Sequence, residues 1–336
     1  MKKIKLLPII LLFCLLLSSL GLPALALEEP ELSSSYAVLM DADSGRIFYQ
    51  KDADAKAYPA SLTKVMTVLV AVEAVERGEF SLTDSVTASD TCLEGMVDDG
   101  STAGIVPGET MPLQDLLYCA LLASANEACN VIAEYIGGSV DAFVEMMNTR
   151  AEELGCTGTH FANTHGLPDE NHYTTAHDIA LIYREAISHD LFAEISGTVS
   201  YSVAPTNVSD VRELSNTNSL INQNATFYPG YYYEYAKDGK TGHTSAAGYC
   251  LVSSAEKNGV HVDETFTGFK FMAEKLAEYK RDGSYNYILA YEESYGYMMG
   301  DYVRDKDAVT ASMMIAEMAA YYFSKGMTLA DALEGL

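Results

Sequence analysis

Residues 58–67 read Tyr-Pro-Ala-Ser-Leu-Thr-Lys-Val-Met-Thr, a stretch that joins a candidate nucleophile to the start of an apolar run. Apolar residues recur at helical spacing from Val65 onward, which predicts a helix that begins near Ser61 and ends before Gly78. Three residues along a helix place Lys64 one turn from Ser61, on the same face. A serine hydroxyl is a weak nucleophile until a base takes its proton, so this spacing suits a serine activated by a lysine.

Two further short motifs follow in the chain. Residues 124–126 read Ser-Ala-Asn at a predicted break between two apolar helices, and residues 240–244 read Lys-Thr-Gly-His-Thr on a predicted strand. Each motif alone is weak, because an S-x-x-K or an S-x-N is most often a helix cap and a K-T-G is often a turn. All three together, in this order and at the spacing of an ordinary domain, favour the chemical interpretation.

Each member of the set suits one task in acyl transfer. A lysine serves as a base only if burial or a nearby positive charge lowers its pKa, and Lys240 would supply that charge to Lys64. Unpaired N–H groups at a helix start favour an oxyanion beside Ser61. The other members would handle the substrate: Ser124 would deliver a proton to the leaving amine, Asn126 would hold an amide, Thr241 would meet a carboxylate and Gly242 would allow close approach.

The remaining pattern predicts an α/β (α+β) fold in which a sheet flanked by helices joins both ends of the chain. A turn at residues 41–45 lies between two of the predicted strands, which favours a hairpin. The predicted elements are strands at 35–40, 46–50, 201–203 and 250–254, and helices at 61–76, 112–123, 127–135, 140–154 and 175–187.

Composition excludes several classes of function. With 47 acidic against 21 basic residues the formal net charge is −26, which disfavours binding to nucleic acid or to anionic lipid. No C-x-x-C or H-E-x-x-H occurs, so no metal site is expected, and the histidines at 160, 165, 172, 177 and 243 are interpreted as polar loop and site residues. Cys119, Cys129 and Cys250 lie in apolar runs and are predicted to be small buried hydrophobic residues.

The N-terminus has the pattern of a signal peptide over residues 1–26. Basic residues precede an apolar run from Leu6 to Leu20, and residues 24–26 read Ala-Leu-Ala, a small-x-small cleavage site. Phe13 ahead of Cys14 disfavours a lipoprotein signal. The chain is therefore expected to be exported, to the cell envelope or the extracellular space.

From about residue 35 to 260 the chain resembles the D-alanyl-D-alanine carboxypeptidases, which are low-molecular-mass penicillin-binding proteins. The resemblance rests on residues 58–67, on Ser-Ala-Asn-Glu-Ala at 124–128, on His-Gly-Leu at 165–167 and on Asp-Gly-Lys-Thr-Gly-His-Thr at 238–244. Ala125 replaces the usual glycine, and Glu127 replaces the usual aspartate.

This resemblance implies a penicillin-binding-protein/β-lactamase-like transpeptidase fold with a helical subdomain. It implies a serine-type carboxypeptidase that removes the terminal D-alanine of peptidoglycan stem peptides ending in D-Ala-D-Ala, without a cofactor, and that β-lactams inhibit covalently. The implied roles are nucleophile for Ser61, base for Lys64, proton relay for Ser124 and Lys240, carboxylate binding for Thr241 and Thr244, and an oxyanion hole from the N–H groups of Ser61 and His243.

After about residue 260 the chain is similar to a different family. Tyr-Glu-Glu-Ser-Tyr-Gly at 291–296, Val-Arg-Asp-Lys-Asp-Ala at 303–308 and a predicted helix at 309–324 resemble an internal fragment of phosphoglucomutase. The phosphoserine loop and the Asp-Gly-Asp metal loop of that family are absent from the sequence, so no mutase activity is expected. We therefore expect a chimera whose carboxypeptidase domain, 27–260, lacks its last strands and is followed by a foreign α/β segment, 261–336.

Three alternatives remain open at this point. The chain could be a chimera that keeps the motifs without activity. It could be a β-lactamase, for which the loop after Phe161 offers the carboxylates of Asp169 and Glu170. It could also be a transpeptidase, which differs only in the acceptor. A membrane anchor is not evident, because the predicted helix at 309–324 carries few basic residues.

Overall fold

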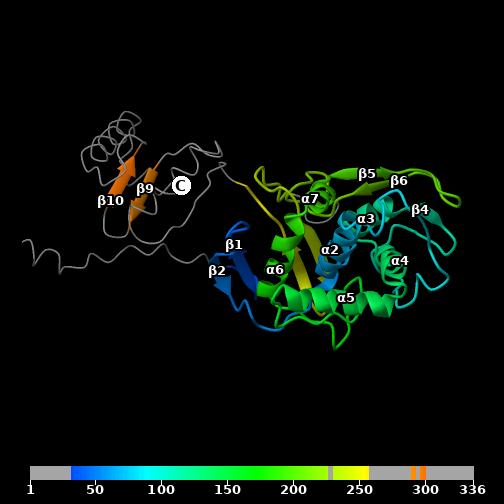
Figure 1. Cartoon of the computed structure of the whole chain (residues 1–336), viewed down its shortest axis with the longest axis horizontal. Coiled ribbons are helices and arrows are strands. Elements are labelled where there is room, and N and C mark those ends of the chain that lie inside the picture. Colours follow the sequence, from blue (N-terminus) through cyan, green and yellow to red (C-terminus); the bar gives the residue numbers. More distant parts are fainter. Residues whose placement is uncertain (1–31, 226–229, 257–288, 293–295, 300–336) are drawn as a thin grey trace, which may run out of the picture. The chain divides into compact units, whose positions relative to one another are not determined.

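In a computed structural model, the structure describes residues 32–225, 230–256, 289–292 and 296–299 (Figure 1). The predicted signal peptide and the predicted helix at 309–324 lie outside the described residues. The chain divides into two compact units, Met1–Lys257 and Asn258–Leu336. In the second unit, β9 (Leu289–Glu292) pairs antiparallel with β10 (Gly296–Met299).

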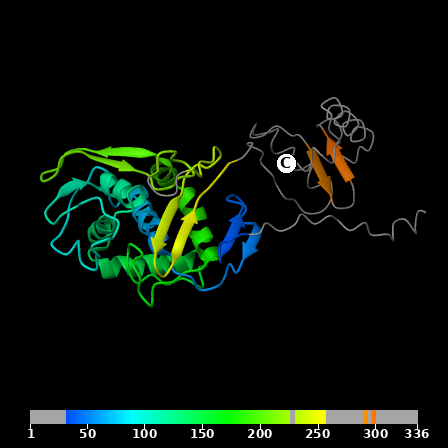
Figure 2. The same cartoon turned by 180° about the vertical axis from the view of Figure 1, so that it is seen from behind.

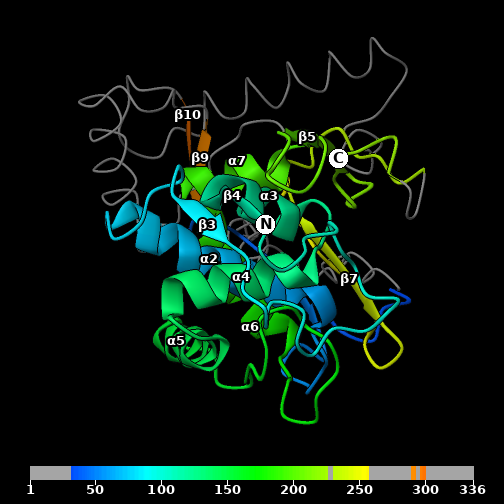
Figure 3. The same ribbon diagram turned by 90° about the vertical axis from the view of Figure 1, so that its right-hand side faces the viewer.

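One helix, α2 (Thr63–Glu76), forms the centre of the first unit. It follows directly on a short 3₁₀ helix, η1 (Ala60–Leu62), and nearly all of its side chains are buried. A helix that is apolar on every side belongs in the interior of a domain. Accordingly α2 packs against five other helices, several of which surround it in Figures 1 and 3. The helix predicted from residues 58–67 is confirmed.

The helices around α2 follow the expected order. They are α3 (Leu113–Leu121), α4 (Asn126–Gly137), α5 (Val140–Glu153), α6 (Ala176–Ile187) and α7 (Asp190–Gly197). The hydroxyls of Ser139 and Thr175 accept N–H groups of the first turns of α5 and α6, as N-caps do. Gly138 ends α4 with a φ of 77°, a backbone conformation that glycine adopts easily. Helix α7 was not predicted.

The strands form antiparallel pairs. The pairs in the first unit are β1 (Ala37–Met40) with β2 (Ile47–Lys51), β3 (Ser85–Thr87) with β4 (Thr110–Pro112), β5 (Ser200–Val203) with β6 (Arg212–Ser215), and β7 (Lys240–Thr244) with β8 (Gly248–Val252).

The single sheet expected to join the two ends of the chain is found instead as separate hairpins. β1–β2 and β7–β8 are not hydrogen-bonded to each other, because within the described residues no strand pairs with the second edge of either β1 or β8. Both hairpins pack against α6 and lie beside it in Figure 2. Helix α6 therefore links the two hairpins.

The cysteines in the described part of the chain are free thiols. The prediction that Cys119 and Cys129 are buried hydrophobic residues is confirmed, whereas Cys250 is only half-buried because it lies on β8, a strand whose second edge is unpaired in the described part of the chain. Burial raises the pKa of Cys119 to about 12 and that of Cys129 to about 11, so both thiols stay protonated. Within the described residues, no helix is both long enough and apolar enough to cross a membrane.

Candidate active site

Ser61 and Lys64 lie together where η1 runs into α2. The Nζ atom of Lys64 is 2.9 Å from Oγ of Ser61, as the one-turn spacing predicted. The same Nζ donates to Oδ1 of Asn126 at 2.8 Å and to the backbone carbonyl of His165 at 2.7 Å. Two fixed acceptors from other parts of the chain thus hold the Lys64 amine against the Ser61 hydroxyl.

The two lysines of the motifs are buried, and burial sets their protonation. It lowers the pKa of Lys64 to about 8, although the Cys129 and Glu127 side chains oppose that shift. Burial also places the pKa of Lys240 well below its usual range, and the neighbouring charge of Lys64 lowers it further. From the sequence, burial and the charge of Lys240 were both expected to lower the pKa of Lys64, and burial is the principal cause.

Ser124 lies between α3 and α4, at the predicted helix break. Its φ of 58° is in the left-handed region, which costs an L-residue free energy and is typical of functional positions. This conformation lets its hydroxyl accept a hydrogen bond from Nζ of Lys240 at 3.0 Å. The same Nζ donates to the carbonyl of Thr241 at 2.9 Å. The second and third motifs therefore meet through a lysine–serine contact.

Strand β7 runs directly beside the Ser61 backbone. A Cβ atom on Gly242 would lie 2.9 Å from the backbone nitrogen of Ser61, so only glycine leaves this approach free. The hydroxyl of Thr241, on the same strand, is 2.6 Å from that of Thr217 in the loop after β6. The carbonyl oxygen of a substrate bound at the Ser61 N–H would thus lie against the backbone of β7.

The last two residues of the third motif lie toward the β7–β8 turn. His243 is exposed and stacks on Tyr249 with ring centroids 4.5 Å apart. The Thr244 hydroxyl accepts the N–H of Ala247 at 3.0 Å. Their positions on β7 are as predicted, while their substrate contacts remain predictions.

Sequence reasoning missed the part that the 160–175 loop plays in the site. Nδ1 of His172 accepts the N–H of Ala162, which leaves the imidazole proton on Nε2, 2.7 Å from the Thr63 hydroxyl. That hydroxyl in turn donates to the carbonyl of Ala60, a residue with a φ of 47°. The loop therefore supports the strained turn just before Ser61. A histidine-rich loop was visible in the sequence, but its backbone contacts carry no sequence signal.

The two buried histidines predict acid sensitivity. Burial lowers the pKa of His165 to about 3 and that of His172 to about 4, and each Nδ1 accepts a backbone N–H that protonation would break. As pH falls, the imidazoles of the unfolded chain bind protons at a higher pH than those of the folded chain. The contribution of the two imidazoles to the free energy of unfolding should therefore be fully present above pH 6.5 and be lost as pH falls toward 4. Each imidazole should contribute up to about 1.4 kcal/mol per pH unit.

Urea unfolding at several pH values measures this dependence. A His172→Gln variant should flatten the slope between pH 6.5 and 4. An unchanged slope would contradict the assignment, and the exposed His160→Gln variant is the matched control.

Comparison with known protein families decides what this geometry belongs to. The family model described as D-alanyl-D-alanine carboxypeptidase matches residues 24–267. The chain belongs to the D-alanyl-D-alanine carboxypeptidase family. The resemblance inferred from the three motifs is confirmed.

Relatives within the carboxypeptidase family include D-alanyl-D-alanine carboxypeptidase DacF of Bacillus subtilis, which is 35% identical over 243 residues, 72% of this chain and 59% of the relative. D-alanyl-D-alanine carboxypeptidase DacA of Escherichia coli is 34% identical over 255 residues, 75% of this chain and 60% of the relative. The chain thus spans about three fifths of the length of these relatives.

Solved structures confirm the fold class. Penicillin-binding protein 5 of Haemophilus influenzae is 32% identical, with a TM-score of 0.60 over 69% of this chain and 64% of that one. A variant of the Streptomyces K15 DD-transpeptidase is 28% identical, with a TM-score of 0.61 over 69% of this chain and 88% of that one. The carboxypeptidase part therefore has the predicted penicillin-binding-protein fold.

The C-terminal part matches a second family. A model described as phosphoglucomutase/phosphomannomutase, alpha/beta/alpha domain III, matches residues 228–336 and overlaps the carboxypeptidase match between residues 228 and 267. The second resemblance is thereby confirmed: the C-terminal part of the chain is similar to that family.

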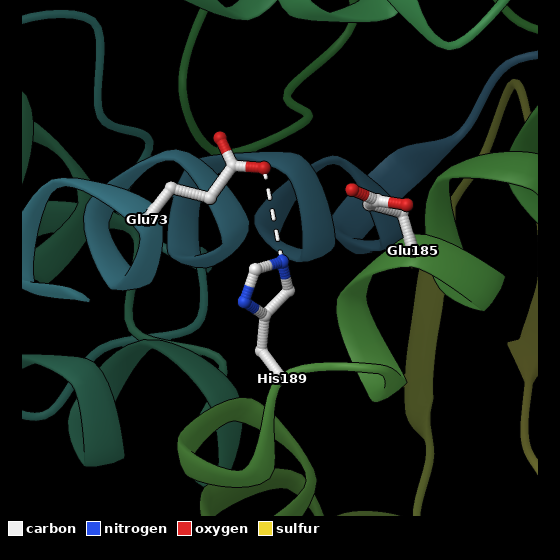
Figure 4. Close-up of side chains that lie close together, drawn as sticks. All are labelled: Glu73, Glu185 and His189. Carbon is white, nitrogen blue, oxygen red and sulfur yellow. Dashed lines mark ion pairs between the residues drawn. The ribbon is translucent and has the colours of Figure 1, made fainter. Parts of the chain in front are cut away.

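Away from the carboxypeptidase motifs, Glu73, Glu185 and His189 bring potential metal ligands within 4.8 Å of one another (Figure 4). The guanidinium of Arg150 already lies between the carboxylates, with Nη2 2.8 Å from Glu73 and 2.5 Å from Glu185. Nδ1 of His189 is 2.6 Å from Glu76. We interpret this group as an ion-pair network that joins α2, α5 and α6, because a metal ion would have to displace Arg150.

Proposed function

We propose that the chain is a serine-type D-Ala-D-Ala carboxypeptidase, which removes the terminal D-alanine from peptidoglycan stem peptides. One observation carries the proposal: the buried Nζ of Lys64, with its pKa lowered to about 8, lies 2.9 Å from the Ser61 hydroxyl. A neutral amine has two N–H groups and one lone pair. Asn126 and His165 accept the two N–H groups, so the lone pair faces the Ser61 proton.

Acylation follows from this arrangement. The Ser61 proton moves to Lys64, and Oγ bonds to the carbonyl carbon of the penultimate D-alanine. The backbone N–H groups of Ser61 and His243 stabilise the oxyanion beside β7. Ser124, bound to Lys240, delivers a proton to the nitrogen of the scissile peptide bond. That bond breaks, D-alanine leaves and an ester on Ser61 remains, which water hydrolyses to free the serine.

The rest of the set holds the substrate. Thr241 and Thr244 bind its terminal carboxylate, Gly242 admits its backbone beside Ser61, and Asn126 holds its amide. β-Lactams acylate Ser61 by the same route, because their carbonyl and carboxylate resemble those of D-Ala-D-Ala. No cofactor takes part in these steps.

The geometry favours the carboxypeptidase over a β-lactamase. The 160–175 loop presents the carbonyl of His165 to Lys64. The side chain of Asp169 is bound to the N–H of Asn171, and Glu170 is exposed. Among the contacts of the described residues, none joins either carboxylate to Ser61 or Lys64, where a β-lactamase needs a carboxylate to activate its deacylating water. Transfer to an amine in place of water would make the chain a transpeptidase, the activity named for the Streptomyces K15 neighbour.

The domain plan belongs to the same proposal. Residues 1–26 are a signal peptide that exports the chain to the cell envelope, residues 27–260 form the carboxypeptidase domain, and residues 261–336 form a phosphoglucomutase-like segment without mutase activity. In this plan the carboxypeptidase domain lacks its last strands, as the sequence resemblance implies.

Release of D-alanine from diacetyl-Lys-D-Ala-D-Ala by the chain from Leu27 to Leu336 tests the proposal. The matched peptide ending in L-Ala should release no alanine, because inverting the terminal residue would point its methyl group away from the position that the D-alanine methyl group occupies. Folded protein that releases no D-alanine would contradict the proposal and support the inactive-chimera alternative. Rapid turnover of nitrocefin would favour the β-lactamase.

A further inference from the structure

Glu127 is a buried carboxylate next to the site with no part in the mechanism above. It lies in the first turn of α4, directly after Asn126, and only 2% of its surface is exposed. A carboxylate this deeply buried is retained only where hydrogen bonds satisfy it.

One oxygen of Glu127 fixes a turn of the segment between β3 and β4. Oε1 accepts hydrogen bonds from the Thr102 hydroxyl and the Ala103 N–H, both at 2.7 Å, and from the Ile105 N–H at 3.3 Å. Apart from bends and turns, residues 88–109 have no regular structure. Hydrogen bonds to Glu127 therefore hold residues 102–105 in place, as the backbone hydrogen bonds of a helix or sheet would in a regular segment.

The same segment touches Asn126. The backbone N–H of Asn126 donates to the carbonyl of Ser101 at 2.9 Å. Gly100 lies so close that a Cβ atom there would be 2.9 Å from Nδ2 of Asn126. The other end of that amide, Oδ1, accepts the Lys64 hydrogen bond. A continuous set of contacts thus leads from Glu127 through residues 100–105 to Asn126 and Lys64.

Glu127 also adds charge near the base. It is one of two α4 groups that raise the pKa of Lys64 against the effect of burial. The titratable groups that face Lys64 are Glu127 and Cys129 from α4, Lys240 from β7, and His165 and His172 from the 160–175 loop. Glu127 is the carboxylate of this group, and its charge raises the pKa of Lys64.

We propose that Glu127 is a positioning residue of the carboxypeptidase site: its carboxylate holds residues 101–105 against Asn126, and its negative charge balances the Lys64–Lys240 pair. This inference rests on the proposed function. It predicts two separable effects, one on the orientation of Asn126 and one on the pH at which Lys64 loses its proton.

The rate of acylation by benzylpenicillin, followed against pH in the mature chain, separates the two effects. Glu127→Gln keeps an oxygen acceptor but removes the charge, so the rise of the rate with pH should move about half a pH unit lower. Thr102→Val removes one hydrogen bond and keeps the charge, so its plateau should fall a few-fold with an unmoved midpoint. Glu127→Asp keeps the charge and should keep the wild-type midpoint. Folding of each variant is checked by its thermal unfolding.

Titration of the Lys64 amine by NMR in the resting protein is the second measurement. Its pKa should be lower in Glu127→Gln than in wild type, and unchanged in Thr102→Val. Equal midpoints and plateaus for wild type and Glu127→Gln would overturn the inference. A wild type that fails to react with benzylpenicillin would contradict the proposed function alone, because the NMR titration still tests Glu127.

Discussion

Replacing Ser61 with alanine should abolish the covalent adduct with benzylpenicillin. Wild-type mature chain incubated with the drug should gain the mass of one penicilloyl group, while Ser61→Ala gains none. The reason is that Oγ is the atom that forms the ester, and Ser61 is the hydroxyl bonded to Lys64. Release of D-alanine should fall by at least about 10³-fold, which leaves only the contribution of binding and the oxyanion site. Intact mass and D-alanine release measure the two effects.

The matched control is Ser124→Ala, which removes the other serine of the site but not the nucleophile. Its adduct should form more slowly and still reach one equivalent, because Ser124 acts through the proton on Lys240. An adduct that persists in Ser61→Ala would place the nucleophile elsewhere. No adduct on folded wild type, with the penicillin left intact, would mean that the site is not competent in this chain.

Replacing Lys64 with arginine should slow acylation almost as severely. A guanidinium keeps the positive charge and can still donate to Asn126 and to the His165 carbonyl. It cannot lose a proton in this pH range, however, so it cannot serve as the base. We expect acylation by benzylpenicillin to slow by about 10²- to 10⁴-fold, the usual contribution of a general base. Stopped-flow or quenched mass measurements give the rate.

Lys64→Met is the companion variant, since it keeps the volume of a fully buried side chain and removes the charge. Both variants should fold and both should be slow. If arginine lost rate and methionine did not, neither the basicity nor the charge of Lys64 would be decisive, and the volume of its side chain would be. In wild type, the acylation rate should rise with pH up to about 8, where Lys64 becomes neutral.

The helical centre and the catalytic side chains could be predicted because local patterns encode them. An apolar run long enough to fill α2 and a serine three residues before a lysine are visible in the sequence without tertiary information. Strands β3, β4 and β6 and helix α7 were missed because they are too short to show a period. The separation of the two hairpins depends on pairing between distant segments, which local pattern does not specify.

The environment of the site could be predicted less well than its members. The lowered pKa of Lys64 and burial as one of its causes were expected, but the opposing effect of the Cys129 and Glu127 side chains was not. The left-handed conformation of Ser124 and the turn held by Glu127 have no signature in residue type. The sequence therefore identified which groups come together in the site. The structure shows which contacts hold each group and how its surroundings shift its pKa.

The contact between Lys64 and the His165 carbonyl has an evolutionary consequence. A side-chain acceptor can be lost by a single codon change, but every amino acid carries a backbone carbonyl, so no substitution at position 165 deletes this one. Mutations that arise by drift or under drug selection can remove this acceptor only if they change the backbone conformation of the 160–175 loop. The sensitive place is Gly166, whose φ of 94° other residues rarely adopt. In an alanine scan, substitution of residue 165 would therefore measure only the loss of its imidazole, because the carbonyl oxygen stays. Substitution of Gly166 would measure the loss of the hydrogen bond between that carbonyl and Lys64.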